Sequence, residues 1–407
     1  MKNTKRTKRV KTCVRTLGIT VLAAVIGFSM LACGDSNGEN NGNGNGNGNG
    51  NGNGNGNGNG SGGPYTVTFD SGTGATAVAA LTDVAHGATI TAPTPPTRPF
   101  TITEPGLYFG EIPANYTFVE WRNGETAWNF AASTVTANIT LTAHWTSSAN
   151  RIETVAANDI PAAVTRVNLS GAANDGAYTL AINQNVTLTA LLQLNVRSRE
   201  LTIIGLGGER TITSPVTGAF RLGVTNSNAA PPPSMTLGAN ITISGVNNMT
   251  ANLIEVSRSN LTMKTGSKIT GFNSSANNSP VLITAGGVVD TASFTMDGGE
   301  ISGNSATVGN NNGSAGVRVT ASCTFTMNGG TITGNSLTDT ASGVTNGGGG
   351  VTVTMNTGSF IMNGGSITGN TRNDEARDVS YVTGATITYN DGTIGALWNQ
   401  TSTEAKP

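Results

Sequence analysis

Apolar and polar residues alternate in short runs through the C-terminal part of the chain, and glycine pairs interrupt the runs. The clearest copies read Phe-Thr-Met-Asp-Gly-Gly-Glu-Ile-Ser-Gly-Asn at 294–304, Phe-Thr-Met-Asn-Gly-Gly-Thr-Ile-Thr-Gly-Asn at 325–335 and Phe-Ile-Met-Asn-Gly-Gly-Ser-Ile-Thr-Gly-Asn at 360–370. Each copy predicts two short strands with their apolar residues on one face. A single copy cannot bury such a face, whereas stacked copies can. The pattern therefore predicts a β-solenoid, and weaker copies at 235–245, 261–271 and 387–395 extend it.

A third short strand is expected upstream of each copy, at 253–256, 281–283, 317–319 and 351–353. The residues that would point outward from it are Glu255, Leu282, Arg318 and Thr352. The segments Ser305–Ala315, Ser336–Gly349 and Thr371–Asp378 differ in length, and insertions in a solenoid gather on one face. We expect these loops to flank Glu255 and Arg318, which become the candidate binding residues. The open alternative is that the loops only tolerate changes in length.

Residues 65–146 have a different pattern, with longer alternating runs rich in aromatic side chains. Strands are predicted at 65–69, 116–121 and 139–145. Three of the four tryptophans lie here, and we expect them to form most of a small core.

The N-terminus has the organisation of an export signal. Seven basic residues precede Thr16, an apolar run extends from Leu17 to Ala32, and Cys33 follows. The order predicts a lipoprotein signal peptide at 1–32, with Cys33 as the lipidated first residue of the mature chain. An uncleaved anchor is the alternative. Residues 33–64 are dominated by Asn-Gly repeats, which cannot bury apolar surface and predict a flexible tether. The rest of the chain would thus be held at the cell envelope, at the outer membrane or the cell surface.

Residues 65–146 resemble the Listeria–Bacteroides repeat, which is related to the internalin B repeat. The resemblance is carried by Tyr-Thr-Val-Thr-Phe-Asp at 65–70, Tyr-x-Phe-x-x-Trp at 116–121, Trp-Asn-Phe at 128–130 and Ile-Thr-Leu-x-Ala-x-Trp at 139–145. It implies a β-grasp-like fold. Glu120 replaces the usual glycine, and an insertion at Thr101–Ala114 lengthens the central loop.

Residues 150–407 resemble the right-handed parallel β-helix of pectate-lyase-like proteins and of surface proteins with Gly-Gly-x-Ile repeats. The predicted fold class is therefore all-β, with a β-grasp-like repeat domain followed by a right-handed parallel β-helix.

The net charge and the cysteine and histidine content exclude some classes of partner and ligand. Removal of seven of the 22 basic residues leaves 15 against 23 acidic residues, a net charge of −8. An acidic surface repels phosphates, so we expect no nucleic-acid partner. Cys323 would be the one cysteine left besides Cys33, and neither His86 nor His144 has metal-ligand spacing. We expect no metal and no cofactor.

Enzymes on a β-helix scaffold need paired carboxylates or a calcium cluster. The outward column contains one acidic residue, Glu255, and so offers neither arrangement. If coils stack in register, Lys264 meets Asp297 and Lys268 meets Glu300, which predicts exposed ion pairs; a charged ligand site is the alternative. The acidic residues of 374–378 alternate with arginines and predict a solvated turn.

The sequence thus predicts no catalytic residue. The expected function is binding, adhesion or envelope structure, with the bilayer as partner through acylated Cys33 and a glycan or surface protein as ligand. Two alternatives stay open: a carbohydrate-active enzyme, either a polysaccharide lyase or a hydrolase, and a passive envelope component. We also expect Asn273, Asn304, Asn335 and Asn370 to stack as an internal amide ladder, because each follows the glycine that ends a repeat.

Overall fold

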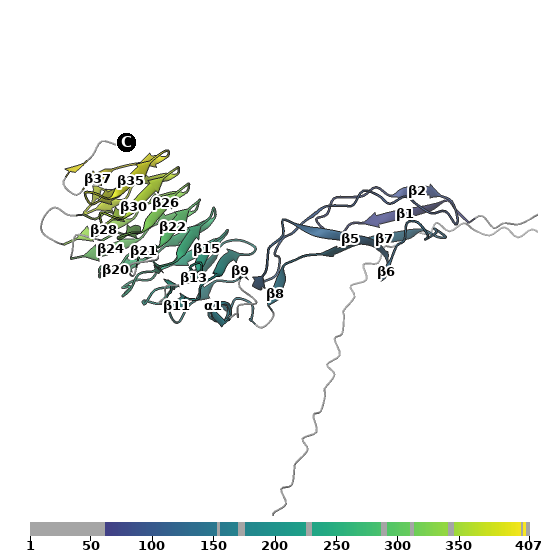
Figure 1. Cartoon of the computed structure of the whole chain (residues 1–407), viewed down its shortest axis with the longest axis horizontal. Coiled ribbons are helices and arrows are strands. Elements are labelled where there is room, and N and C mark those ends of the chain that lie inside the picture. Colours follow the sequence, from purple (N-terminus) through teal and green to yellow (C-terminus); the bar gives the residue numbers. More distant parts are fainter. Residues whose placement is uncertain are drawn as a thin grey trace, which may run out of the picture. The chain divides into compact units, whose positions relative to one another are not determined.

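The protein is almost entirely β in a computed structural model that describes residues 62–152, 155–169, 176–224, 230–285, 291–309, 313–340, 346–399 and 402–403 (Figure 1). The predicted signal peptide 1–32, Cys33 and nearly all of the tether lie outside these ranges. One α-helix, α1 (Ile160–Leu169), is present in them. None of the helical structure in these ranges is long and apolar enough to span a bilayer.

The first unit is a mixed sheet built around a parallel pair. Its strand order is β2-β1-β7-β5-β3, and β6 pairs with β5. Strands β1 and β7 are parallel, and the other pairs are antiparallel. The strands are β1 (Tyr65–Asp70), β2 (Leu81–Val84), β3 (Arg98–Pro99), β5 (Asn115–Asn123), β6 (Thr126–Ala127) and β7 (Ile139–Thr146).

The core of this unit is more aliphatic than expected. Trp121 is buried and meets Phe69 edge-on at 4.9 Å between ring centroids. Trp128 packs only partly against the core, and Trp145 touches Phe118 from a half-exposed position. The prediction that tryptophans form most of the core is therefore wrong. Val67, Ile90, Val135 and Leu141 fill the rest of the core.

Three long sheets, parallel along the coils, form the solenoid that the repeats predict. Every neighbouring pair between β9 and β35, between β10 and β36 and between β11 and β37 is parallel. The ten-stranded sheet consists of β35 (Thr386–Tyr389), β30 (Ser359–Met362), β26 (Thr324–Met327), β22 (Ser293–Met296), β18 (Asn260–Met263), β15 (Ser234–Leu237), β12 (Arg199–Gly205), β9 (Gly176–Ile182), β4 (Gly106–Phe109) and β8 (Asn150–Ile152). The eight-stranded sheet consists of β10 (Val186–Thr187), β13 (Arg210–Thr213), β16 (Ile241–Ser244), β19 (Ser267–Thr270), β23 (Glu300–Ser302), β27 (Thr331–Thr333), β31 (Ser366–Thr368) and β36 (Thr393–Ile394). The nine-stranded sheet consists of β11 (Leu192–Leu194), β14 (Phe220–Gly223), β17 (Ile254–Ser257), β21 (Val281–Thr284), β25 (Val317–Val319), β29 (Val351–Val353), β34 (Val379–Tyr381), β37 (Leu397–Asn399) and the hairpin strand β38 (Ser402–Thr403).

The repeats stack in the register that the sequence predicts. Phe294, Phe325 and Phe360 are adjacent partners, and their rings stack inside the coil at 4.8 and 5.3 Å between centroids. The isoleucines of the Gly-Gly-x-Ile motif form a second fully buried row, which includes Ile301 and Ile332. Each coil therefore covers the apolar faces of its neighbours, which no single repeat could do.

The Gly-Gly turn leaves no room for a side chain. A Cβ on Gly330 would lie 2.6 Å from the carbonyl oxygen of Gly299 in the preceding coil, and its φ of +86° is left-handed. Gly334, which ends the repeat, has a φ of +63°. Glycine is therefore favoured at both corners by backbone conformation, and at the first it is required by the closeness of the coils.

A fourth parallel sheet begins in the segments that the sequence analysis treats as variable loops. It consists of β20 (Asn273–Ser274), β24 (Ser305–Val308), β28 (Ser336–Asp339), β32 (Thr371–Arg372) and the antiparallel β33 (Glu375–Ala376). The three predicted loops thus return to one face, as expected, but their first residues are ordered strands. Parts of two of them, 310–312 and 341–345, lie outside the described residues.

The N-terminal end of the solenoid is covered by α1, a helix that was not predicted from the sequence. Asp159 caps the helix by accepting a hydrogen bond from the Ala162 amide at 3.0 Å. Ile160, Ala163, Val164 and Val167 form its buried face. The nearly buried Arg199 donates from Nε to the Val167 carbonyl at 3.1 Å, which satisfies a carbonyl near the helix C-terminus.

The insertion in the first unit supplies an additional strand to the solenoid. Strand β4, from the expected insertion Thr101–Ala114, pairs antiparallel with β9 and with β8. Leu107 is fully buried and belongs to the solenoid core, not to the core of the first unit. The insertion therefore covers β9, the first coil strand of the ten-stranded sheet, and β8 forms the edge beyond it.

Candidate binding surface

The outer face of the ten-stranded sheet carries columns of short polar side chains. One column consists almost entirely of half-buried threonines that are successive partners along the sheet: Thr202, Thr236, Thr262, Thr295, Thr326, then Ile361 and Thr388. The neighbouring outward column begins with the exposed Glu200 and continues with Ser234, Asn260, Ser293, Thr324, Ser359 and Thr386. Because successive side chains along a strand alternate between faces, both columns face away from the core. From β15 to β35, uncharged and mostly hydroxyl-bearing groups thus recur from coil to coil, about 4.8 Å apart.

A ladder of exposed side chains borders these columns. Asn390 donates to Asn363 at 2.7 Å, Asn363 to Asn328 at 2.8 Å, and Asn328 to the carboxylate of Asp297 at 2.7 Å. The other carboxylate oxygen of Asp297 accepts a bond from Lys264 at 2.6 Å. Hydrogen bonds from Lys264 and Asn328 hold the pKa of Asp297 below its ordinary value.

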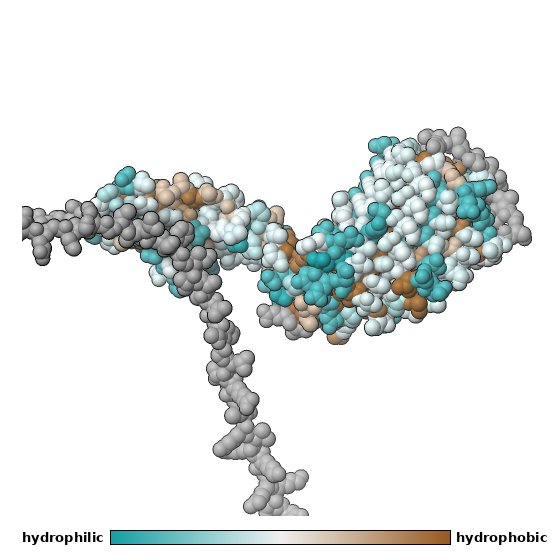
Figure 2. Space-filling view, turned by 180° about the vertical axis from the view of Figure 1, so that it is seen from behind, coloured by the Kyte–Doolittle hydropathy of each residue, from teal (hydrophilic) through white to brown (hydrophobic). Residues whose placement is uncertain are grey.

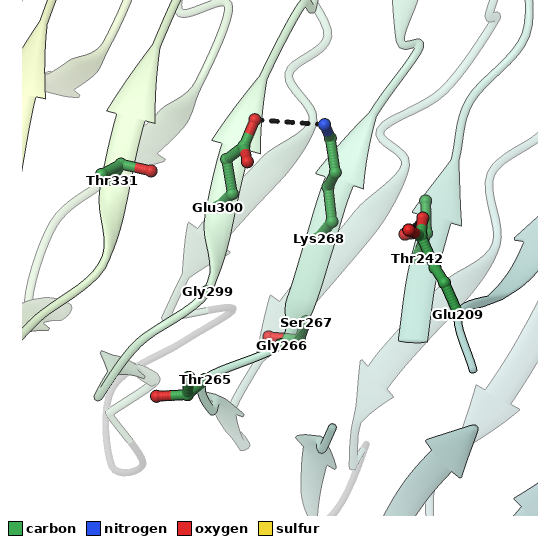
Figure 3. A pocket seen from close by; sticks show the side chains of 9 residues that line it. All are labelled: Glu209, Thr242, Thr265, Gly266, Ser267, Lys268, Gly299, Glu300 and Thr331. Atoms are coloured by element: carbon green, nitrogen blue, oxygen red, sulfur yellow. Dashed lines mark hydrogen bonds and ion pairs between the residues drawn. The ribbon is translucent and has the colours of Figure 1, made fainter. Parts of the chain in front are cut away.

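The eight-stranded sheet has a charged hollow on its outer face, of about 400 Å³ (Figure 3). Lys268 and Glu300 project from adjacent strands and form an ion pair at 3.1 Å, as the register predicts. Beside them, the hydroxyl of Thr242 donates to Glu209 at 2.6 Å. Hydrogen bonds from Ser302 and Lys268 lower the pKa of Glu300. A general acid of a glycosidase needs a raised pKa, so Glu300 has the opposite of the required property.

The predicted column of Glu255 and Arg318 is in register but is not a continuous open surface. Glu255, Leu282, Arg318 and Thr352 are successive partners. Glu255 pairs with Arg221 at 3.3 Å. Arg318 is largely covered and donates to the carbonyl of Asn277 at 3.3 Å, and burial lowers its pKa. Thr352 is fully buried. Binding at Glu255 and Arg318 stays a prediction, in which Glu255 is the more accessible group.

The segment 371–378 is only partly the solvated turn that was predicted. Asp374 and Glu375 are exposed, but Arg372, Arg377 and Asp378 are buried. Arg372 forms an ion pair with Asp339 at 2.8 Å, and Arg377 lies over the ring of Trp398 at 4.0 Å. The prediction of a solvated turn is wrong for these three residues, because the segment enters the fourth sheet and packs against the last coil.

An internal amide ladder is present, and it contains three of the four predicted asparagines. Asn304 donates from its amide nitrogen to Asn335 at 2.9 Å, and Asn335 donates to Asn370 at 2.8 Å. Asn370 donates to the buried carboxylate of Asp378 at 2.8 Å. These four side chains are almost completely inaccessible to water. The ladder continues the repeat but ends on a residue outside it.

Asn273 does not belong to this ladder. It is exposed, it is the partner of Ser305, and its amide donates to the Ser305 hydroxyl at 2.9 Å. Phe272 takes the ladder position, and its backbone N–H donates to Asn304 Oδ1 at 3.0 Å. The prediction for Asn273 is therefore wrong, because this coil has one extra residue between the glycine and the asparagine.

Two further groups give no indication of chemistry. Cys323 is buried, and burial raises the pKa of its thiol, so the reactive thiolate is disfavoured. Within the described ranges, no three residues among His, Cys, Asp and Glu are placed to hold a metal ion.

The space-filling view agrees with a surface of weakly polar groups. The visible face of the solenoid is mostly pale, the colour of near-neutral hydropathy, with separate hydrophilic and hydrophobic patches (Figure 2). No protein-family model, curated protein or solved structure matches the chain.

Proposed function

We propose that the chain is an exported, lipid-anchored surface protein that binds a neutral glycan without catalysis, on the outer face of the ten-stranded sheet. The observation that carries the proposal is the threonine column. Its hydroxyls make no hydrogen bond with another described residue, so they are free to exchange bonds with a ligand. An extended polysaccharide lying along the solenoid axis would meet equivalent donors and acceptors at each coil.

Charge supports a neutral ligand. Beside the coils from β15 to β35, the carboxylate of Asp297 is already bonded to Lys264 and Asn328, and the exposed Glu200 lies one coil before them. A ligand rich in hydroxyl groups can pair with threonine and asparagine side chains without the desolvation of a free ion.

Isosteric substitutions test this surface. Replacing Thr295 and Thr326 together by Val keeps shape and β-propensity but removes two hydroxyls. If each hydroxyl forms one hydrogen bond of about 1 kcal/mol with the ligand, binding to a neutral polysaccharide weakens by about tenfold or more. The measurement is a pull-down or affinity gel with a panel of neutral polysaccharides.

The matched control is T270V/T333V, on the eight-stranded sheet. Equal binding by the wild type and T295V/T326V would overturn the assignment of this face. Failure of the wild type to bind any glycan of the panel would favour the passive envelope component instead.

The anchor is proposed from the order of basic residues, apolar run and cysteine at the N-terminus. The variant Cys33→Ala should release the protein from the membrane fraction, because it lacks the acylated residue. Fractionation followed by immunoblotting measures this. Unchanged retention would contradict the lipoprotein proposal.

We also propose the finer fold assignment that the resemblance implies. A parallel central pair flanked by antiparallel strands, as in β2-β1-β7-β5, supports a β-grasp-like first unit. The parallel register of the coils supports a β-helix, and we propose that it is right-handed, as parallel crossover connections generally are.

A further inference from the structure

A hollow in the first unit contains an arginine whose charge has no acidic partner. It has a volume of about 400 Å³ and is lined by Thr73, Gly74, Arg98, Pro99, Thr101, Thr103 and Tyr116. Arg98 on β3 and Tyr116 on β5 are directly opposed across the antiparallel pair. The guanidinium carbon of Arg98 lies 4.6 Å from the centroid of the Tyr116 ring.

The contact with the Tyr116 ring uses none of the N–H groups of Arg98 in a hydrogen bond. A guanidinium can lie over an aromatic ring and still donate its N–H groups to other partners. No carboxylate of the described residues forms an ion pair with Arg98, and its N–H groups donate to none of their acceptors. Such a planar, bidentate donor is the usual partner of a carboxylate.

Another arginine of the same sheet shows the contrast. Arg122 on β5 is held by Glu120, with 2.8 Å from both Nε and Nη2 to the same carboxylate oxygen. Arg122 is thus already neutralised by the protein, and Arg98 is not.

The walls of the hollow are fixed by local hydrogen bonds. The amide of Gly72 donates to the Asp70 carboxylate at 2.9 Å, and Gly74 has a left-handed φ of +78°. The backbone N–H of Thr76 donates to the Thr97 carbonyl at 2.8 Å, and the backbone N–H of Thr97 donates to the Thr76 hydroxyl at 2.9 Å. On the other side, the Phe100 ring packs against Tyr116 at 4.9 Å between centroids. Arg98 is therefore held between two fixed segments, with the exposed residues Thr73, Thr101 and Thr103 around it.

We propose that this hollow binds the carboxylate of an acidic sugar, such as a uronate residue of a polysaccharide. Arg98 would pair with the carboxylate through two parallel hydrogen bonds. The surrounding threonine hydroxyls suit the ring hydroxyls next to the carboxylate, and a peptide carboxylate on a flexible stem offers no such groups. This site is separate from the proposed surface for neutral glycans on the solenoid.

Binding of oligogalacturonate to the full chain tests the proposal, measured by isothermal titration calorimetry. The variant R98A should weaken binding by at least tenfold, because the bidentate partner is lost. R98K keeps the charge but not the planar fork, and we expect it to recover only a small part of the affinity. R122A should bind as the wild type does. T295V/T326V should also leave this binding unchanged, which separates the site from the solenoid surface.

Four results would overturn the proposal: unchanged binding by a folded R98A variant, an equal loss in R122A, full affinity in R98K, or no binding by the wild type. Equal binding of poly-glutamate would replace the acidic sugar with an acidic peptide. Circular dichroism of each variant confirms the fold, and R98K provides the test if R98A does not fold.

Discussion

The solenoid has a buried and an exposed ladder of asparagine side chains. Both are built from hydrogen bonds that a side-chain amide donates to the next side chain, but the bonds point in opposite directions along the chain. In the buried ladder, each side-chain amide donates toward the C-terminal end, from Asn304 to the carboxylate of Asp378. In the exposed ladder, the amides donate toward the N-terminal end, from Asn390 to the carboxylate of Asp297. Each ladder therefore ends at a carboxylate, which can accept several bonds and donates none when ionised.

The difference lies in what surrounds the bonds. In the buried ladder, Asn335 Oδ1 also accepts the backbone N–H of Asn304, and Asn335 Nδ2 also donates to the Ile301 carbonyl. Water cannot replace these partners. In the exposed ladder, water competes for every bond. The geometry is similar, but we expect the energetic consequences to differ severalfold.

The largest effect is expected from Asn335→Ala. The change removes the acceptor of the Asn304 backbone N–H, one of the two acceptors of Asn304 Nδ2, and a donor to the Ile301 carbonyl, all in the interior. It should lower the free energy of unfolding by about 3 kcal/mol. Asn363→Ala on the exposed ladder is the matched control and should change it by about 0.5 kcal/mol or less. Urea denaturation followed by circular dichroism compares them, and equal losses would mean that burial does not distinguish the ladders.

A smaller effect is expected at the ladder ends. Asp378 accepts three N–H bonds, from the Asn370 backbone, the Asn370 side chain and the Ala396 backbone. In Asp378→Asn, an amide N–H₂ group must face at least one of these donors. We expect a loss of about 2 kcal/mol.

Asp297→Asn is the corresponding exposed change. It removes the ion pair with Lys264 at the surface and should cost below about 1 kcal/mol. Urea midpoints of the two variants give the comparison. A larger loss at Asp297 than at Asp378 would reverse the proposed role of burial.

The smallest change in stability is expected from a change in pH. Because the pKa values of Asp297 and Glu300 are lowered from 3.8 and 4.5, the folded state favours their ionised forms. Their contribution to stability is present above these values and is lost as the pH falls through the lower folded-state pKa values. We expect the wild type and Lys264→Met to differ slightly at pH 6 and to converge below pH ~3. Urea midpoints across this pH range are the measurement, and a difference that grows with acid would be inconsistent with the ion pair.

The solenoid could be predicted from the sequence because each coil repeats the same short sequence pattern. Glycine pairs, the Phe-x-Met strand and the isoleucine fix register from one copy to the next, so Lys268 and Glu300 could be paired from sequence alone. The prediction for Asn273 was wrong because one inserted residue, Phe272, shifts a single coil.

Other features depend on contacts between distant segments. The strand that pairs with the insertion could not be predicted from the neighbouring sequence, because β4 pairs with β9, which lies about seventy residues later in the chain. The burial of Arg318 depends in part on the turn that carries Asn277. Helix α1 did have a local signal: Asp159 before Pro161, with apolar residues at the spacing of one helical face.

The strand β4 also limits assembly of the protein with itself. The ten-stranded sheet has β35 at one end, and without β4 and β8 it would have β9 at the other. Two complementary bare edges at opposite ends of a stack permit head-to-tail addition of copies, which does not close and produces fibres. The insertion covers β9 with the antiparallel strand β4, so the edge at this end is the three-residue strand β8 and not a strand of a coil. A chain without residues 101–114 should therefore be prone to polymerise, whereas the intact chain is protected at that end.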